Sequence, residues 1–128
     1  MNIIISHSSD KPIYEQIITQ LKQKIITGEL KEGDELPSLR FLAKELRISV
    51  ITTKRAYEEL AHEEFIISRP GKGYYIGEKN MEKVKEVQLD TIKIHLEKAI
   101  QLGTTSGLSL KDLYQVMTAL YEKKINEK

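Results

Sequence analysis

LPSLRFLAKELRISVITTKRAY, residues 36–57, has the pattern of two short helices joined by a tight turn. Apolar residues recur along the first helix at the spacing of one helical face. They are Leu39, Leu42, Ala43 and Leu46. Ser38 and Ser49 each precede a helical run and are suited to cap its N-terminus. Two helices of this size separated by three or four residues indicate a helix-turn-helix unit.

The apolar pattern also predicts how far the second helix of this unit extends and where an earlier helix lies. Its second helix is expected from Val50 to about Glu63, with an inward stripe of Thr53, Ala56, Tyr57 and Leu60. An earlier helix is expected from Pro12 to about Thr27, because isoleucine or leucine recurs every four residues and Gly28 marks a stop. Ser9 and Asp10 are its candidate caps.

The spacing of apolar residues changes after residue 64 from a period of about 3.6 residues to a period of 2. This change predicts strands at 65–69 and 74–76 around the turn Pro70–Gly73. A lone hairpin is marginally stable, so Ile67 or Ile76 should face the helices. The predicted fold is mostly α with a small β-hairpin, a winged helix-turn-helix domain over residues 1–77.

Residues 78–128 predict a second region, an αα-hairpin. A long helix over 79–102 carries two apolar stripes, Gly103–Gly107 should break the chain, and Ser109 to Asp112 matches a capping box before a last helix. Two helices cannot bury both stripes, so a second copy of the chain is the expected partner in a homodimer. The predicted dimerization residues are Val84, Val87, Leu89, Ile92, Leu96, Ile100, Leu113, Met117 and Leu120.

Composition excludes several classes of protein. The 128 residues carry a net charge of +1, which excludes a globally basic nucleic-acid binder. Residues 37–77 are the basic part, with 7 basic and 5 acidic side chains. No apolar run is long enough to span a membrane, and the N-terminus does not resemble a signal peptide. Without cysteine, disulfides are excluded, and the cytoplasm is the expected compartment.

Catalysis has little support. His7, His62 and His95 are scattered, and no pair has the spacing of metal ligands. Residues 71–73, Gly-Lys-Gly, lack the flanking strand, helix and hydroxyl residue of a phosphate-binding loop. We therefore expect neither an enzyme, nor a metal site, nor a cofactor.

Position within the helix-turn-helix unit points to DNA contacts. Val50, Ile51, Thr52 and Lys54 occupy the start of the second helix, the part that meets base edges in this motif. One alternative places Val50 in the core under the hairpin.

Cations and a hydroxyl outside that helix are candidate phosphate ligands. Arg40 lies where a guanidinium reaches phosphate, although an ion pair with Glu45 or Glu32 would also explain it. Ser38 contacts phosphate or merely caps its helix, and Arg69 and Lys72 flank the turn of the hairpin.

These motifs together resemble the DNA-binding domain of the GntR family of bacterial transcription regulators. The resemblance covers residues 9–77 and includes KPIYEQI at 11–17, LPSLRFLA at 36–43, LRISVITTKRAY at 46–57 and PGKG at 70–73. The short two-helix tail is similar to that of the YtrA-type subfamily, in which it serves dimerization.

The resemblance implies roles at matching positions. Arg40 matches a DNA-contacting arginine, Ser49, Thr52 and Lys54 match recognition-helix positions, and Gly71 and Lys72 match the tip of the wing. The chain departs from the family at Val50 and Ile51, where many members have Asn, Arg or Pro, and at Glu64, often a glycine.

Two functions compete on this basis. The first is a homodimeric, sequence-specific repressor that binds double-stranded operator DNA as an inverted repeat. The second is a winged-helix module that binds protein and no specific DNA. The sequence names no effector, and the tail has little material for a closed small-molecule pocket.

Overall fold

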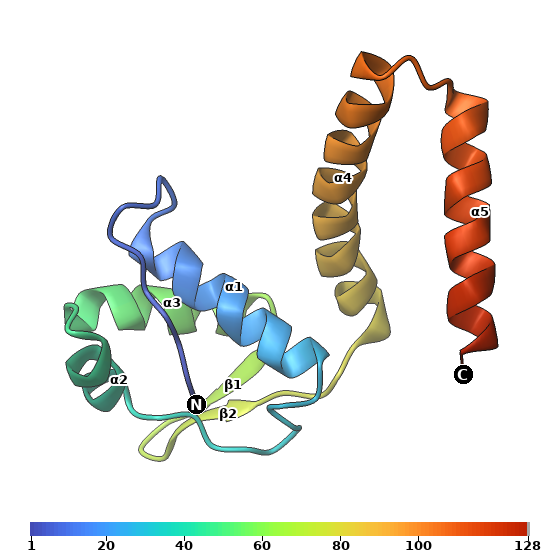
Figure 1. Cartoon of the computed structure of the whole chain (residues 1–128). Coiled ribbons are helices and arrows are strands. Elements are labelled where there is room, and N and C mark those ends of the chain that lie inside the picture. Colours follow the sequence, from blue (N-terminus) through green and yellow to red (C-terminus); the bar gives the residue numbers. More distant parts are fainter. Residues whose placement is uncertain (128) are drawn as a thin grey trace. The chain divides into compact units, whose positions relative to one another are not determined.

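A computed structural model describes residues 1–127, which form two compact units that divide after Asn80 (Figure 1). The first unit contains α1 (Ile13–Ile26), α2 (Leu39–Leu46), α3 (Val50–His62), β1 (Ile66–Arg69) and β2 (Gly73–Ile76). The second contains α4 (Met81–Thr105) and α5 (Leu110–Asn126). The predicted mostly α fold, a winged helix-turn-helix followed by an αα-hairpin, is confirmed.

The first unit encloses a core of its own. Each of its helices and both strands contribute side chains to it, and the predicted inward stripe of α3 is buried along its whole length. The most deeply buried members are Ile17, Leu21, Ala56, Tyr57, Leu60, Ile66 and Ile76. A core filled from three helices and a hairpin holds the unit together independently of the rest of the chain.

Serine caps begin both helices of the helix-turn-helix, as predicted. Ser38 Oγ accepts from the Phe41 backbone N–H at 3.1 Å, and Ser49 Oγ accepts from that of Thr52 at 3.2 Å. The prediction for α1 is wrong, because Pro12 occupies its N-cap position and no side chain caps it. Ser9 Oγ accepts instead from the Lys11 N–H, which lies before the helix.

Helices α2 and α3 end in the same way. A residue other than glycine takes the left-handed conformation after each, Arg47 with φ 56° and Glu64 with φ 65°. After α3, the Phe65 N–H donates to Leu60 O at 2.9 Å, which is the long bond of a Schellman motif. Glu64 thus adopts a conformation that glycine takes more easily.

The wing is an antiparallel hairpin whose second strand, β2, is paired on both of its edges. Its register pairs Ile66 with Ile76, and both are buried against the helices, whereas Ile67 is exposed. The sequence offered Ile67 or Ile76 as the inward residue, and it is Ile76. The segment before α2 pairs with the other edge of β2, since Leu36 N–H donates to Tyr74 O at 2.9 Å.

The second unit consists of two antiparallel helices joined by a short turn. Ser109 Oγ accepts from the Asp112 N–H at 3.1 Å, and Asp112 Oδ2 accepts from the Ser109 N–H at 2.9 Å, so the predicted capping box is confirmed. The break predicted over Gly103–Gly107 begins later than expected, because α4 continues to Thr105 and the turn lies at Ser106 and Gly107. Gly103 is buried against Leu113, and a Cβ there would lie 3.1 Å from Leu113 Cδ2.

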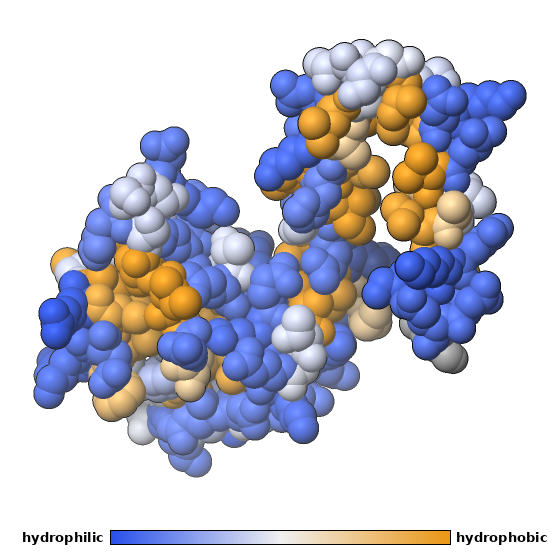
Figure 2. All heavy atoms as spheres, in the orientation of Figure 1, coloured by the Kyte–Doolittle hydropathy of each residue, from blue (hydrophilic) through white to orange (hydrophobic). Residues whose placement is uncertain are grey.

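Apolar side chains of the second unit remain largely uncovered. Within the described part of the chain, no residue of α5 is buried, and Gly103 is the one buried residue of α4. Figure 2 shows hydrophobic residues of both helices lining the inner side of this hairpin. The sequence assigned one stripe of α4 to α5, yet neither stripe is buried.

Over residues 1–127, none of the helices combines the length and the apolar content that crossing a lipid bilayer requires.

Candidate nucleic-acid interface

The turn between α2 and α3 is locked by hydrogen bonds. Ile48 N–H donates to Ala43 O at 3.0 Å across the left-handed Arg47. The buried Thr53 hydroxyl lies 3.1 Å from Leu39 O and 2.8 Å from Val50 O, and these two carbonyls share its single proton. Because Leu39 belongs to α2, this hydroxyl ties the start of α3 to the start of α2.

Tyr57 holds the segment that leads into α2. Its hydroxyl donates to Pro37 O at 2.9 Å, and its ring meets that of Tyr74 edge-on at 5.0 Å. Burial, and to a lesser degree Tyr74, raise the pKa of Tyr57 well above its usual range. The hydroxyl therefore stays protonated and remains a donor. It places Ser38 and the first turn of α2 relative to α3.

The first turn of α3 presents apolar side chains to solvent. Ile51 is 79% exposed and Val50 41% exposed, so the alternative that buries Val50 under the wing is wrong. Thr52 lies beside them, and its hydroxyl is hydrogen-bonded to Ser49 Oγ at 2.9 Å. Val50, Ile51 and Thr52, which the sequence placed at the start of this helix, therefore lie together on its first turn.

Arg40 is exposed on the first turn of α2. Among residues 1–127 it has no carboxylate within ion-pair distance, so neither Glu45 nor Glu32 pairs with it. Lys54 does have a partner, Glu58, with 3.8 Å between Nζ and Oε1. That pair is well exposed, and exposed pairs of this kind are weak. Both cations are therefore accessible to an anionic ligand.

The wing carries a cation whose orientation is set by an aromatic ring. Arg69 lies over the ring of Tyr75 at 4.6 Å, and Lys72 N–H donates to Arg69 O at 2.9 Å to close the turn. Gly71 has φ 75° there, a value that favours glycine. Sequence reasoning missed Tyr75, although the period of 2 places it on the same face as Arg69.

A second stacked pair was also missed. The guanidinium of Arg55 lies 3.8 Å from the ring centroid of Tyr14, and its Nη2 donates to the Tyr14 hydroxyl at 3.1 Å. This contact joins the middle of α3 to the start of α1. The two residues lie 41 positions apart, so no local pattern could have predicted it.

In the part of the chain that the structure describes, no three His, Cys, Asp or Glu side chains are grouped to hold a metal ion. The three histidines are exposed and lie in different segments.

These features define the class of protein, a winged helix-turn-helix protein of the DNA-binding class. They are a core of three helices, a helix whose first turn is exposed to solvent, and a hairpin with a cation beside its turn. Residues 13–76 match the model of the family described as "Bacterial regulatory proteins, gntR family". The chain belongs to this GntR family, and it is a transcriptional regulator with a DNA-binding domain.

Relatives of similar length extend the match into the tail. The HTH-type transcriptional repressor YtrA of Bacillus subtilis is 37% identical over 113 residues, 88% of this chain and 87% of that protein. A solved GntR family transcriptional regulator from Listeria monocytogenes is 30% identical, covers 90% of this chain and 98% of its own, and has a TM-score of 0.67. A transcriptional regulator from Oenococcus oeni is 26% identical with a TM-score of 0.72, covering 91% and 97%.

Proposed function

We propose that this protein is a homodimeric repressor that binds an inverted-repeat operator in the cytoplasm. The observation that carries the proposal is the joint exposure of the first turn of α3 and of Arg40 in the first turn of α2. In a helix-turn-helix these are the elements that meet the major groove and the DNA backbone. The relative that it resembles along most of its length, YtrA of Bacillus subtilis, is a repressor.

Each candidate residue has a role in this proposal. Val50, Ile51 and Thr52 meet base edges, while Ser49 caps the helix that carries them. Arg40 and Lys54 contact phosphates, and Ser38 keeps a hydroxyl proton for a phosphate while its oxygen caps α2. Arg69 and Lys72 supply charge from the wing, where Gly71 forms the turn.

The tail is proposed as the dimer interface. Large apolar side chains on both of its helices are exposed in a single chain, and monomeric proteins rarely leave so many together uncovered. A second hairpin of the same sequence offers the complementary apolar surface. The exposed members include Leu89, Ile92, Leu96, Ile100, Met117 and Leu120, and the partly buried ones are Val84, Val87 and Leu113.

The test is selection of bound sequences from random duplexes by the full-length protein, followed by a salt titration on the selected site. We expect an inverted repeat and an affinity that falls steeply with salt, because phosphate contacts release counterions. Failure to enrich any sequence, with binding to protein partners that salt leaves unchanged, would favour the protein-interaction module.

Arg40→Ala sharpens this test. Loss of one phosphate contact should lower affinity for most sequences and reduce the slope of log K against log salt by about 0.9. Lys98→Ala, which removes an exposed cation from α4, is the matched control and should leave the slope unchanged. An unchanged slope in Arg40→Ala would contradict the phosphate role.

A further inference from the structure

The first turn of α3 displays apolar groups where a DNA reader usually displays polar ones. Guanine is read by arginine or lysine, and adenine by asparagine or glutamine. None of these side chains stands in the first turn, which consists of Val50, Ile51 and Thr52 after the Ser49 cap. The hydroxyl of Thr52 is hydrogen-bonded to Ser49 Oγ, and the hydroxyl of Thr53 is buried against backbone carbonyls.

Ile51 is the most exposed large apolar residue of the first unit, at 79%. Covering such an exposed, branched side chain with an apolar group removes apolar surface from water and so stabilises the complex. In the major groove of DNA the one apolar group on a base edge is the 5-methyl group of thymine. The chemistry of this turn is therefore matched to thymine rather than to guanine or adenine.

We propose that this regulator reads thymine in its operator through the 5-methyl group, with Ile51 as the main contact and Val50 beside it. The inference rests on the proposed function, because it assigns a base to the same surface. It names Ile51 as a specificity-determining residue, and it places the base-specific part of recognition in an apolar contact instead of a hydrogen bond.

The experiment uses deoxyuridine in place of thymidine at each position of the selected operator in turn. Uracil keeps the pairing and the groove acceptors of thymine and lacks only the methyl group. Loss of one buried methyl group corresponds to binding that is about fourfold weaker. We expect a loss of this size at one or two thymines of each half-site, and recovery with 5-bromodeoxyuridine, whose bromine is close to methyl in size.

Ile51→Ala identifies the side chain that makes the contact. Its affinity for the thymine operator should fall by a similar factor, and its response to deoxyuridine at the sensitive position should disappear. Ile51→Val keeps a branched apolar side chain and should retain the response. Circular dichroism of each variant checks that the fold is kept.

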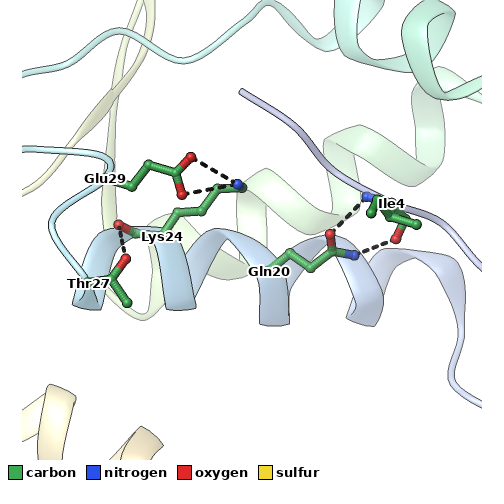
Figure 3. Close-up of polar contacts among 5 residues, drawn as sticks. All are labelled: Ile4, Gln20, Lys24, Thr27 and Glu29. Carbon is green, nitrogen blue, oxygen red and sulfur yellow. Dashed lines mark hydrogen bonds and ion pairs between the residues drawn. The ribbon is translucent and has the colours of Figure 1, made fainter.

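Ile4→Ala is the matched control. Ile4 is 74% exposed in the same unit, and its backbone is held by Gln20 through two hydrogen bonds of 2.9 and 2.6 Å (Figure 3). Removal of its side chain therefore leaves the N-terminal segment in place. Affinity and deoxyuridine response should both equal those of the unmodified protein.

The possible failures are distinguishable. If no duplex is enriched, the proposed function itself fails. If an operator is enriched but deoxyuridine changes affinity less than about twofold at every position, the DNA-binding function stands and the thymine inference is overturned. The inference is also overturned if Ile51→Ala keeps the full deoxyuridine response, because another residue then contacts the methyl group.

Discussion

Leu21, Tyr57 and Leu60 of the winged unit are completely buried, whereas Leu96, Ile100 and Leu120 of the helical tail are 42%, 48% and 61% exposed. Both regions contain amphipathic helices with similar apolar residues. The difference lies in how many elements converge, because three helices and a hairpin enclose a volume and two helices do not. The winged unit therefore carries its own stability, and the tail needs additional surface to cover its apolar side chains.

Leu96→Glu should have the largest effect of the changes considered. If a second tail covers this position, the substitution places an unpaired charge in an apolar interface and weakens the dimer by about 3–5 kcal/mol. Sedimentation equilibrium should then show monomers at micromolar concentration. Lys93→Glu changes the charge at an exposed position of the same helix and should leave the dimer intact. A dimer that persists unchanged in Leu96→Glu would contradict the statement that a second tail covers the apolar side chains of this helix.

Tyr57→Phe tests the winged unit. The variant leaves Pro37 O without its donor in a partly buried setting, which should reduce the free energy of unfolding by about 1–2 kcal/mol. Chemical denaturation monitored by circular dichroism measures it. Tyr114→Phe removes the same hydroxyl from an exposed tail residue and should change stability by less than about 0.5 kcal/mol. Equal losses of stability at the two tyrosines would contradict the statement that the winged unit has a packed core and the tail does not.

Arg47→Gly should stabilise the winged unit. The left-handed conformation costs an L-residue about 1–2 kcal/mol, which glycine avoids. Glycine in turn loses about 0.5–1 kcal/mol more backbone entropy on folding, so the net gain in stability is about 0.5–1 kcal/mol. Lys44→Gly, inside α2, should destabilise by about 1 kcal/mol. The same denaturation experiment separates the two signs, and assembly through the tail should be unaffected by either change.

The smallest effect concerns the capping box of α5. Hydrogen bonds from the Ser109 backbone and side chain lower the pKa of Asp112 below its usual value. A lowered pKa in the folded state means that the carboxylate stabilises the helix start above its unfolded-state pKa. This contribution is lost as pH falls through the lowered folded-state pKa.

Carbon-13 titration of the Asp112 carboxyl group should show this lowered midpoint. Ser109→Ala should move the midpoint back toward the usual value, because it removes the side-chain partner. The Ser109 backbone N–H, the larger cause, stays in this variant, so a midpoint left in place would mean that the Ser109 hydroxyl does not contribute to the shift.

Much of the candidate site, and the start of α5 in the tail, could be predicted because the residues that determine them lie close together in the sequence. The caps at Ser38, Ser49 and Ser109 and the turn at Gly71 depend on residues within about four positions of each other. The contacts between Arg69 and Tyr75 and between Arg55 and Tyr14 were not predicted. The first follows from strand register, and the second joins helices far apart in the chain.

Local sequence was thus enough to establish the order of the helices, the caps of α2, α3 and α5, the wing and the family, because helix and turn chemistry acts between near neighbours in the chain. Tertiary structure alone decided that Val50 is exposed, that Arg40 has no ion-pair partner among residues 1–127, and that α4 runs through Gly103 to meet Leu113. Those outcomes depend on which distant atoms occupy the surrounding space. Close packing is a property of the whole three-dimensional arrangement, and no window of sequence contains it.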